Sequence, residues 1–492
     1  MLRALAVTVA FSLLACGPKG DAAHPPGARS AVVSAYPGLA YVPADATYLL
    51  ASHRLDGALQ VVRDLADAVG PLDGMDATRY GAGLARVLGF DPSTAAGLAD
   101  QGFDLERGFA VWARGGLGPV IAMPVADAAR VMARIDRYRA GGAVVQTTSI
   151  DGHDVSTWRA ERELAIHWAF VADWLLVHVE FTVEREADGA WLTAALAAGG
   201  RIGGAADVAA TLAQASQRLG VATPAVIGLL RWPAVRATAA GAETAPCDGT
   251  MGQLGSIMIG ATGDGATAAG VIVADLPGGV ASIRAMALPA PAGWAAARGA
   301  APASAELGLD LRRFQAAWAP CLGDGLTRDA LAAGVFGGRA FALAVDLEDG
   351  KLQGALAATV APAAVAQLRE QIPGLAFLER TRLVGGVTVH DVRLPMVPAI
   401  AYAQTGERLV ATAELPIDPL VTGGDAGAAP LARVELYPQA WPAETWDQLF
   451  GMVIGRDRLR EHMVELFRRW RHGVIEVNLE DRALVLTARG ER

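Results

Sequence analysis

The chain has 492 residues, of which 52% are hydrophobic, and its 51 acidic against 42 basic side chains give a formal net charge of −9. This length exceeds what one hydrophobic core usually organises, so more than one domain is expected. An acidic surface lacks the clustered Lys and Arg that displace counterions from nucleic acid, so we expect no nucleic-acid partner.

The start of the chain has the order of an export signal. Arg3 precedes an apolar run over residues 4–14, which is too short for a spanning helix because that needs about 20 apolar residues. The run ends in the tetrapeptide Leu-Leu-Ala-Cys at Cys16, which resembles the lipobox of bacterial lipoproteins. The resemblance implies that residues 1–15 are removed as a signal peptide and that Cys16 is acylated. An ordinary secretory signal with an accidental Cys is the alternative.

The lipobox resemblance also implies a location. Gly17 follows the cysteine, whereas an Asp at this position tends to retain lipoproteins of diderm bacteria in the inner membrane. We therefore expect an envelope protein anchored by the lipidated Cys16, in the outer membrane and facing the periplasm. An envelope protein or a lipid ligand is the further partner that such a location suggests.

Two segments are predicted to be linkers. Residues 16–40 are rich in Pro, Gly, Ser and Ala and lack apolar periodicity, so they are expected to form a flexible tether. Residues 276–303 are rich in Pro and Ala and are expected to join two folded units.

The body of the chain reads as two copies of one unit. Four short blocks recur in the same order, and this favours tandem copies over residues 41–275 and 304–492. The matched pairs are Pro43 with Pro302, Phe109 with Phe341, His153 with His390, and Trp232 with Trp441. A chance alignment of an Ala-rich chain is the alternative.

Each unit is predicted to be of the α+β class, with a mainly antiparallel meandering sheet and packed helices. In the first unit, in chain order, the patterns predict strand 48–52, helix 55–69, strands 109–113 and 119–123, helix 126–138, and strands 164–171, 174–179, 226–230, 256–261 and 268–274. Short turns between successive strands imply antiparallel pairing. Interspersed helices place the fold in the α+β class. In the second unit the matching turns are expected over 348–350 and 405–407.

Two cysteines remain beyond Cys16. Cys247 and Cys321 each follow an Ala-Pro pair, and in an oxidising compartment they are expected to form a disulfide, which constrains the unfolded chain. Two buried free thiols are the alternative. A metal site is not expected there, because no His or further Cys lies at ligand spacing from either.

Histidines are the first candidates for chemistry. The cluster to consider comprises His153, His167, His178, Asp151 and Asp154 on neighbouring predicted strands. A metal site or an acid–base pair can be drawn from it, but no two histidines stand at i, i+4 or i, i+2 spacing. The second unit has Ala401 and Thr412 at the positions of His167 and His178. We therefore expect structural histidines, and a local hydrogen bond within each recurring His-Asp pair.

Motifs for nucleophiles and cofactors are missing from the sequence. There is no Gly-x-Ser-x-Gly elbow, residues 81–83 lack the third glycine of a dinucleotide loop, and the glycines of 199–204 follow a predicted helix rather than a strand. Carboxylates do not form a glycosidase pair. We therefore expect no catalytic residue, no cofactor and no metal, and a protein that is not an enzyme.

One element interrupts the repeat. Residues 456–472 place apolar side chains at helical spacing, and Gly473 is expected to end the helix. Its arginines are a candidate surface for an anionic partner: Arg456, Arg460, Arg468, Arg469 and Arg471. The alternative is a helix packed on its own sheet with solvated arginines, because Glu461 and Glu465 interrupt the positive charge.

The start of the body, Val42-Pro43-Ala44-Asp45, resembles the opening of a family of exported bacterial proteins that is catalogued as a domain of unknown function. That resemblance implies no activity and no site residues. We expect a non-enzymatic binding or scaffold protein. The alternatives are a periplasmic carrier or chaperone for a lipid or other apolar ligand, which needs an enclosed apolar cavity, and an envelope hydrolase.

Overall fold

The computed structural model describes residues 30–69, 82, 85, 90–115, 118–140, 144–160, 164–181, 189–237, 254–288, 301–310, 313, 341–348, 351–360, 362–371, 375–393, 398–423, 430–447, 464–465 and 467–492. The chain divides into two compact units, Met1–Thr244 with Leu254–Ala274, and Ala245–Gln253 with Asp275–Arg492. Cys16, Cys247, Cys321, Arg456 and Arg460 lie outside the described residues. Lipidation of Cys16 and the disulfide therefore stay predictions.

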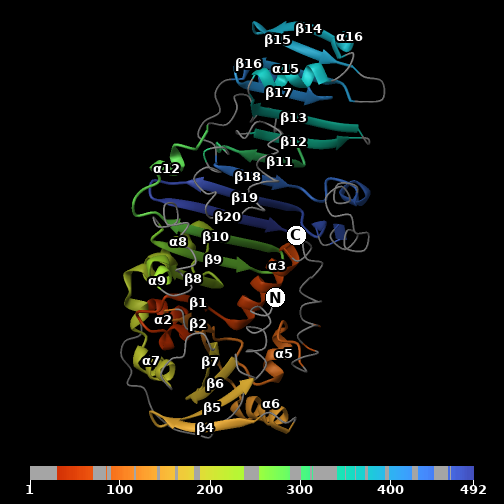
Figure 1. The fold of residues 1–492 in the computed structure, drawn as a ribbon. Coiled ribbons are helices and arrows are strands. Elements are labelled where there is room, and N and C mark those ends of the chain that lie inside the picture. Colours follow the sequence, from red (N-terminus) through yellow and green to blue (C-terminus); the bar gives the residue numbers. More distant parts are fainter. Residues whose placement is uncertain are drawn as a thin grey trace. The chain divides into compact units, whose positions relative to one another are not determined.

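The first unit is built on one antiparallel sheet (Figure 1). Its strands are β1 (Tyr48–Ser52), β2 (Ala110–Ala113), β3 (Val120–Pro124), β4 (Val145–Ile150), β5 (His153–Ala160), β6 (Leu164–Val171), β7 (Trp174–Phe181), β8 (Val226–Arg231), β9 (Ser256–Gly263) and β10 (Thr267–Asp275). Their order across the sheet is β4-β5-β6-β7-β3-β2-β1-β8-β9-β10. The predicted strands therefore exist, and β1 and β6 have the bounds expected from the sequence.

Helices cover both faces of this sheet. They are α2 (Ala31–Ala35), η1 (Pro37–Tyr41), α3 (Leu55–Val69), α5 (Ala95–Asp100), α6 (Ala128–Ala140), α7 (Ala190–Ala198), η3 (Arg201–Gly204), α8 (Ala206–Leu219) and α9 (Trp232–Arg236). Helix α6 packs Val131 and Ile135 into a core cluster with Ile121 of β3 and Trp168 of β6. On the other face, η1 contacts β2 and β3, and both α7 and η3 contact η1.

The second unit is also antiparallel. Its strands are β11 (Ala303–Leu307), β12 (Phe341–Glu348), β13 (Lys351–Thr359), β14 (Glu379–Val384), β15 (Val387–Val392), β16 (Ile400–Thr405), β17 (Arg408–Ala413), β18 (Ala432–Leu436), β19 (His472–Leu479) and β20 (Ala483–Glu491). Its helices are α12 (Ala281–Arg284), α15 (Pro362–Gln371), α16 (Leu375–Leu378) and α17 (Asp418–Thr422). Helices and antiparallel sheets in both units make the protein α+β, as predicted.

The strands of the two units follow the same order. In the second unit it is β14-β15-β16-β17-β13-β12-β11-β18-β19-β20, which repeats the first order strand by strand. Ala110 pairs with Ala122 and Ala342 pairs with Ala357, in keeping with the expected match of Phe109 and Phe341. On this ground we propose that the units arose by duplication.

Strand register overturns the match of His153 with His390. His153 pairs with Ile150 beside the turn between β4 and β5, and the residue in that place in the second unit is Val387, which pairs with Val384. His390 lies three residues further along β15. An odd shift moves a side chain to the opposite face of a sheet, so the two histidines are not equivalent.

The match of Trp232 with Trp441 is also out of register. Trp232 directly follows β8, whereas Trp441 lies beyond the end of β18 at Leu436. Both indoles are buried. The Trp-Pro recurrence therefore marks the end of a strand in the first unit only.

The tether prediction is wrong for residues 31–40. Ser30 caps α2 by accepting a hydrogen bond from the Val33 N–H, and η1 follows at once. Tyr36 and Leu39 are fully buried, and the Tyr36 hydroxyl donates to the Pro224 carbonyl at 2.9 Å. Two short helical turns give too little periodicity to be recognised, but their apolar side chains are buried inside the first unit.

The linker prediction is wrong for residues 276–288. This stretch belongs to the second unit and contains α12. Leu276, Val280 and Met286 are buried, and the Leu276 N–H donates to the Arg482 carbonyl at 2.7 Å. Strand β11 then begins at Ala303, inside the segment expected to be a linker.

Candidate functional site

A pocket of about 350 Å³ lies on the face of the first sheet that α7 partly covers. Strands β4 to β7 form its floor, and Trp191 of α7 forms part of its wall. Its polar lining comes from Gln146, Thr148, Thr157, Arg159, His167, His178 and Glu180. Titratable side chains of the described first unit thus gather around this hollow.

Strand pairing explains why these side chains converge. Thr157 of β5 is directly opposite His167 of β6, and His167 is directly opposite His178 of β7. Paired residues of antiparallel strands point to the same face. Gln146 of β4 extends the row because it is opposite Thr157, and Glu180 is two residues beyond His178 on the same face.

His167 is held on both sides by hydrogen bonds. Its Nε2 lies 2.9 Å from Glu180 Oε2, and its Nδ1 lies 2.9 Å from Thr157 Oγ1. A carboxylate only accepts hydrogen bonds, so Nε2 carries a proton. In the neutral imidazole Nδ1 then accepts from the Thr157 hydroxyl, which fixes the tautomer.

His178 is the buried member of the row. It is 2% exposed, and neither ring nitrogen has a hydrogen-bond partner among the described residues. Burial, with a smaller effect of nearby His167, lowers the pKa of His178 to about 3. The imidazole is therefore neutral near pH 7 and offers one N–H donor and one acceptor nitrogen.

Trp191 adds a second unpaired donor. Its indole is also 2% exposed, its ring centroid is 5.5 Å from that of His178, and no described residue accepts from its Nε1. Leaving a buried polar group unpaired costs about 1–3 kcal/mol. His178 and Trp191 both line the pocket, so two buried polar groups without a described partner lie on one wall.

The second unit has no equivalent of this row. Counting from the turn of each hairpin, His167 and His178 correspond to Ala401 and Thr412. Thr412 is 3% exposed. The two imidazoles therefore have no counterpart at these described positions of the second unit.

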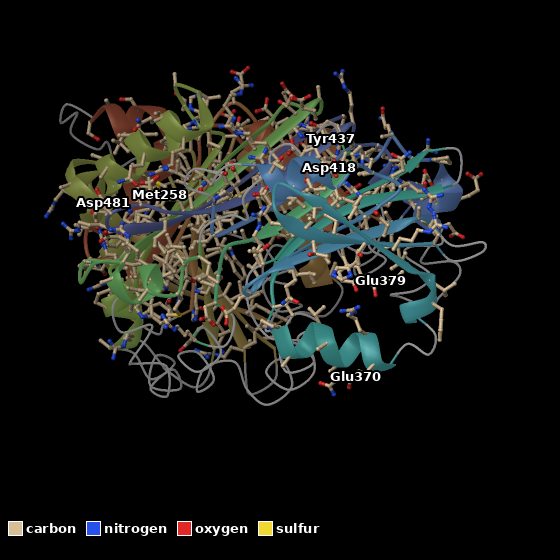
Figure 2. All side chains as sticks on the ribbon, turned by 90° about the horizontal axis from the view of Figure 1, so that it is seen from above. Met258, Glu370, Glu379, Asp418, Tyr437 and Asp481 are labelled. Atoms are coloured by element: carbon tan, nitrogen blue, oxygen red, sulfur yellow. The ribbon has the colours of Figure 1, made fainter. Side chains whose placement is uncertain are left out.

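A polar network in the second unit occupies the other face of its sheet. Glu379 accepts hydrogen bonds from the Tyr402 hydroxyl and from Arg369 of α15, both at 2.6 Å, and pairs with His390. Figure 2 shows Glu379 on the sheet side of α15 and Glu370 on its opposite side. Burial opposes ionisation of Glu379, but the donated hydrogen bonds prevail and hold its pKa below the usual range.

The expected His-Asp hydrogen bond is wrong for the second unit. His390 pairs with Glu379, whereas Asp391 accepts from Arg382 at 3.0 Å. His390 and Asp391 are neighbours on a strand, so their side chains point to opposite faces. The Glu379 network has a partner for each of its charges, and we interpret it as structural.

The predicted basic helix ends earlier than expected. Phe467 is its last helical residue in the described part, Trp470 is buried, and His472 already belongs to β19. Gly473 therefore pairs within the sheet, opposite Gly490, and does not cap a helix. The chain turns after Phe467 and enters β19, and Trp470 is buried at this turn.

The predicted anionic-partner surface has mixed charge where it is described. Arg468 and Arg469 line an open hollow together with Glu444, Asp447 and Glu465, and Arg469 pairs with Glu465 at 3.0 Å. The Arg471 N–H donates to the Glu491 carbonyl, so this residue is tied into the sheet. The described part of the helix favours the alternative of solvated arginines.

Comparisons with known proteins show no family. No protein-family model matches the chain, and no curated protein matches it. The solved structures that match include crystal forms of TP0453, a Treponema protein. Crystal form I is 10% identical with a TM-score of 0.25, covering 49% of this chain and 79% of TP0453. Form IV is 9% identical with a TM-score of 0.26, covering 52% and 87%. These scores are too low to carry an argument about function.

Within the described residues, no group of three or more His, Cys, Asp and Glu side chains is placed to hold a metal ion. No described helix combines the length and apolarity needed to cross a membrane. The described side chains around His167 and His178 offer hydrogen-bond donors and acceptors to the pocket.

Proposed function

We propose that this chain is a lipid-anchored protein of the bacterial envelope that binds a small polar molecule in the pocket of its first unit. The observation that carries the binding role is the pair of buried, unpaired groups on the pocket wall, His178 and Trp191. The anchor rests on the lipobox resemblance at Cys16.

The lining favours a polar ligand over a lipid. A carrier for an apolar molecule needs an enclosed, mainly apolar cavity, whereas this pocket places Glu180, Arg159 and Gln146 beside Ile150 and Val155. Its volume of about 350 Å³ is near the lower end for small-molecule sites. Neutral His178 can donate one hydrogen bond and accept another, and a ligand with hydroxyl or amide groups provides both partners.

Ligand binding is tested by native mass spectrometry of protein purified from the envelope fraction. We expect an additional mass that is lost under denaturing conditions and that is absent from His178→Phe, because Phe cannot form the two hydrogen bonds. The matched control is Thr412→Val in the second unit, which removes a buried hydroxyl at the equivalent strand position and should keep the mass. Wild-type protein without any retained mass, or a mass unchanged by His178→Phe, would contradict binding in this pocket.

Anchoring is tested by detergent phase partitioning. The wild-type protein is expected in the detergent phase, since an acylated Cys16 buries hydrocarbon at about 0.8 kcal/mol per CH₂. Cys16→Ser should move it to the aqueous phase. A wild-type protein that is already aqueous would show that the lipoprotein interpretation is wrong.

A further inference from the structure

We infer that the first-unit pocket also supports acyl transfer, with Thr157 as nucleophile, His167 as general base and Glu180 as the residue that positions the base. The inference rests on the proposed function in one respect: the acyl substrate occupies the pocket proposed to bind a ligand. Its substrate class is a small ester whose acyl group fits beside Ile150 and Val155.

The hydrogen-bond chain has the direction that a nucleophilic hydroxyl needs. Glu180 accepts from Nε2–H of His167 at 2.9 Å, so Nδ1 of the neutral imidazole is unprotonated and accepts from Thr157 Oγ1, also at 2.9 Å. An alcohol, an imidazole and an orienting carboxylate in hydrogen-bond reach are the arrangement that activates Ser and Thr in unrelated folds. Here it lies across three neighbouring strands, so the sheet fixes its geometry.

Access separates the two histidines. The Thr157 side chain is half-buried and lines the pocket, so a substrate can reach its hydroxyl. His178 is more deeply buried than Thr157, and its ring stacks on His167 with centroids 5.5 Å apart. His178 and Trp191 therefore suit binding, and His167 suits proton transfer.

Donors for a developing oxyanion also lie near Thr157. Gln146 is directly opposite it on β4, and Arg159 is two residues further along the same face of β5. Both side chains line the pocket. Donors placed where negative charge develops typically contribute about 10²–10³ in rate, and an amide and a guanidinium both supply N–H groups.

The reaction balances with water as the only co-reactant. A bond forms between Thr157 Oγ1 and the ester carbonyl carbon, and the hydroxyl proton passes to His167 Nδ1. The bond from that carbon to the alcohol oxygen breaks, and the leaving oxygen takes the proton from Nδ1. Water then attacks the acyl-threonine and gives a proton to Nδ1. The acid is released, and the proton returns to Thr157.

The test uses the full chain carrying Cys16→Ser, a fluorophosphonate probe and p-nitrophenyl acetate. We expect peptide mapping to place the phosphonyl group on Thr157, and ester hydrolysis above background that Thr157→Val abolishes. His167→Asn should lower kcat about 10²–10⁴-fold, the usual contribution of a general base. Glu180→Gln should lower kcat more than it raises KM, because Glu180 acts on the reaction mainly through its hydrogen bond to the base His167.

Thr412→Val is the matched control, since Thr412 is a buried threonine on β17 of the second unit and lies outside the pocket. It should keep both labelling and turnover. Absence of label on Thr157, or turnover unchanged in Thr157→Val, overturns the inference. Ligand retention in native mass spectrometry of Thr157→Val shows that the variant is folded and that the binding function stands independently.

Discussion

Replacing His178 by Phe is expected to raise the free energy of unfolding by about 1–3 kcal/mol while it abolishes ligand retention. The imidazole is buried with two unpaired nitrogens, and each buried polar atom without a partner costs about 1–3 kcal/mol. Phe keeps an aromatic ring between His167 and Trp191, both 5.5 Å away by ring centroid. A variant that is more stable and inactive is the usual mark of a binding site that evolution keeps at a cost in stability.

The pH dependence of unfolding gives a second measure on the same variant. The pKa of His178 is about 3 in the folded protein against an ordinary value of 6.5. Between these values the unfolded chain binds the extra proton, so stability falls as the pH falls, by up to about 1.4 kcal/mol per pH unit. From pH 7 to pH 5 this one group should remove about 2 kcal/mol from the wild type and nothing from His178→Phe.

Urea unfolding at pH 7 and pH 5 checks both statements. Thr412→Val serves as the control here too, because it changes a buried hydroxyl in the second unit and leaves every titratable group in place. The difference in free energy of unfolding between Thr412→Val and the wild type should be the same at the two pH values. A less stable His178→Phe, or one whose loss between pH 7 and pH 5 equals that of the wild type, would mean that His178 is already satisfied in the folded protein.

Local elements of this fold could be predicted because short-range patterns determine them. Helix α3 has the bounds predicted from its apolar spacing, and the hairpin of β6 and β7 turns where a polar residue interrupts two apolar runs. Predictions from the sequence were wrong where tertiary contacts override a weak local pattern. Residues 31–40 look like a tether in sequence, yet Tyr36 and Leu39 are drawn into the core.

The pocket was missed for a different reason. The expectation of structural histidines rested on spacing along one helix or one strand, whereas His167 and His178 meet across a hairpin. They are equally distant from its turn, so the register of the predicted hairpin already contained this contact. Thr157 and Glu180 become visible only after that step, and no pattern in the sequence singles out Trp191, which reaches the sheet from α7.

Replacing Trp168 by Ala is expected to have the largest effect on stability, a loss of about 3–5 kcal/mol in the first unit. Its indole is 1% exposed and lies in the cluster that joins β3, β6 and β7 to Ile135 of α6. Truncation leaves a cavity in a packed interior that relaxes only in part. Hydrogen exchange with mass spectrometry should show faster exchange in α6 and β6.

Tyr402→Phe is the matched control in the second unit. Counting from the hairpin turns places Tyr402 where the first unit has Trp168, and this change removes only the hydroxyl that donates to Glu379. We expect a loss of about 1–3 kcal/mol, with exchange altered in β14 to β16 and unchanged in α6. Similar acceleration in both units after Trp168→Ala would contradict the division of the chain into two compact units.

The two faces of one strand should thus respond in opposite ways. Trp168 and His167 are neighbours on β6, so their side chains leave the sheet on opposite sides. Trp168→Ala should lower the stability of the first unit and still leave Thr157, His167 and His178 in place. Native protein at low temperature should therefore retain its ligand. His178→Phe should raise the stability of the first unit and abolish ligand retention. If Trp168→Ala also abolished retention in protein that hydrogen exchange shows to be folded, the pocket would depend on the packed face as well as on its own row of side chains.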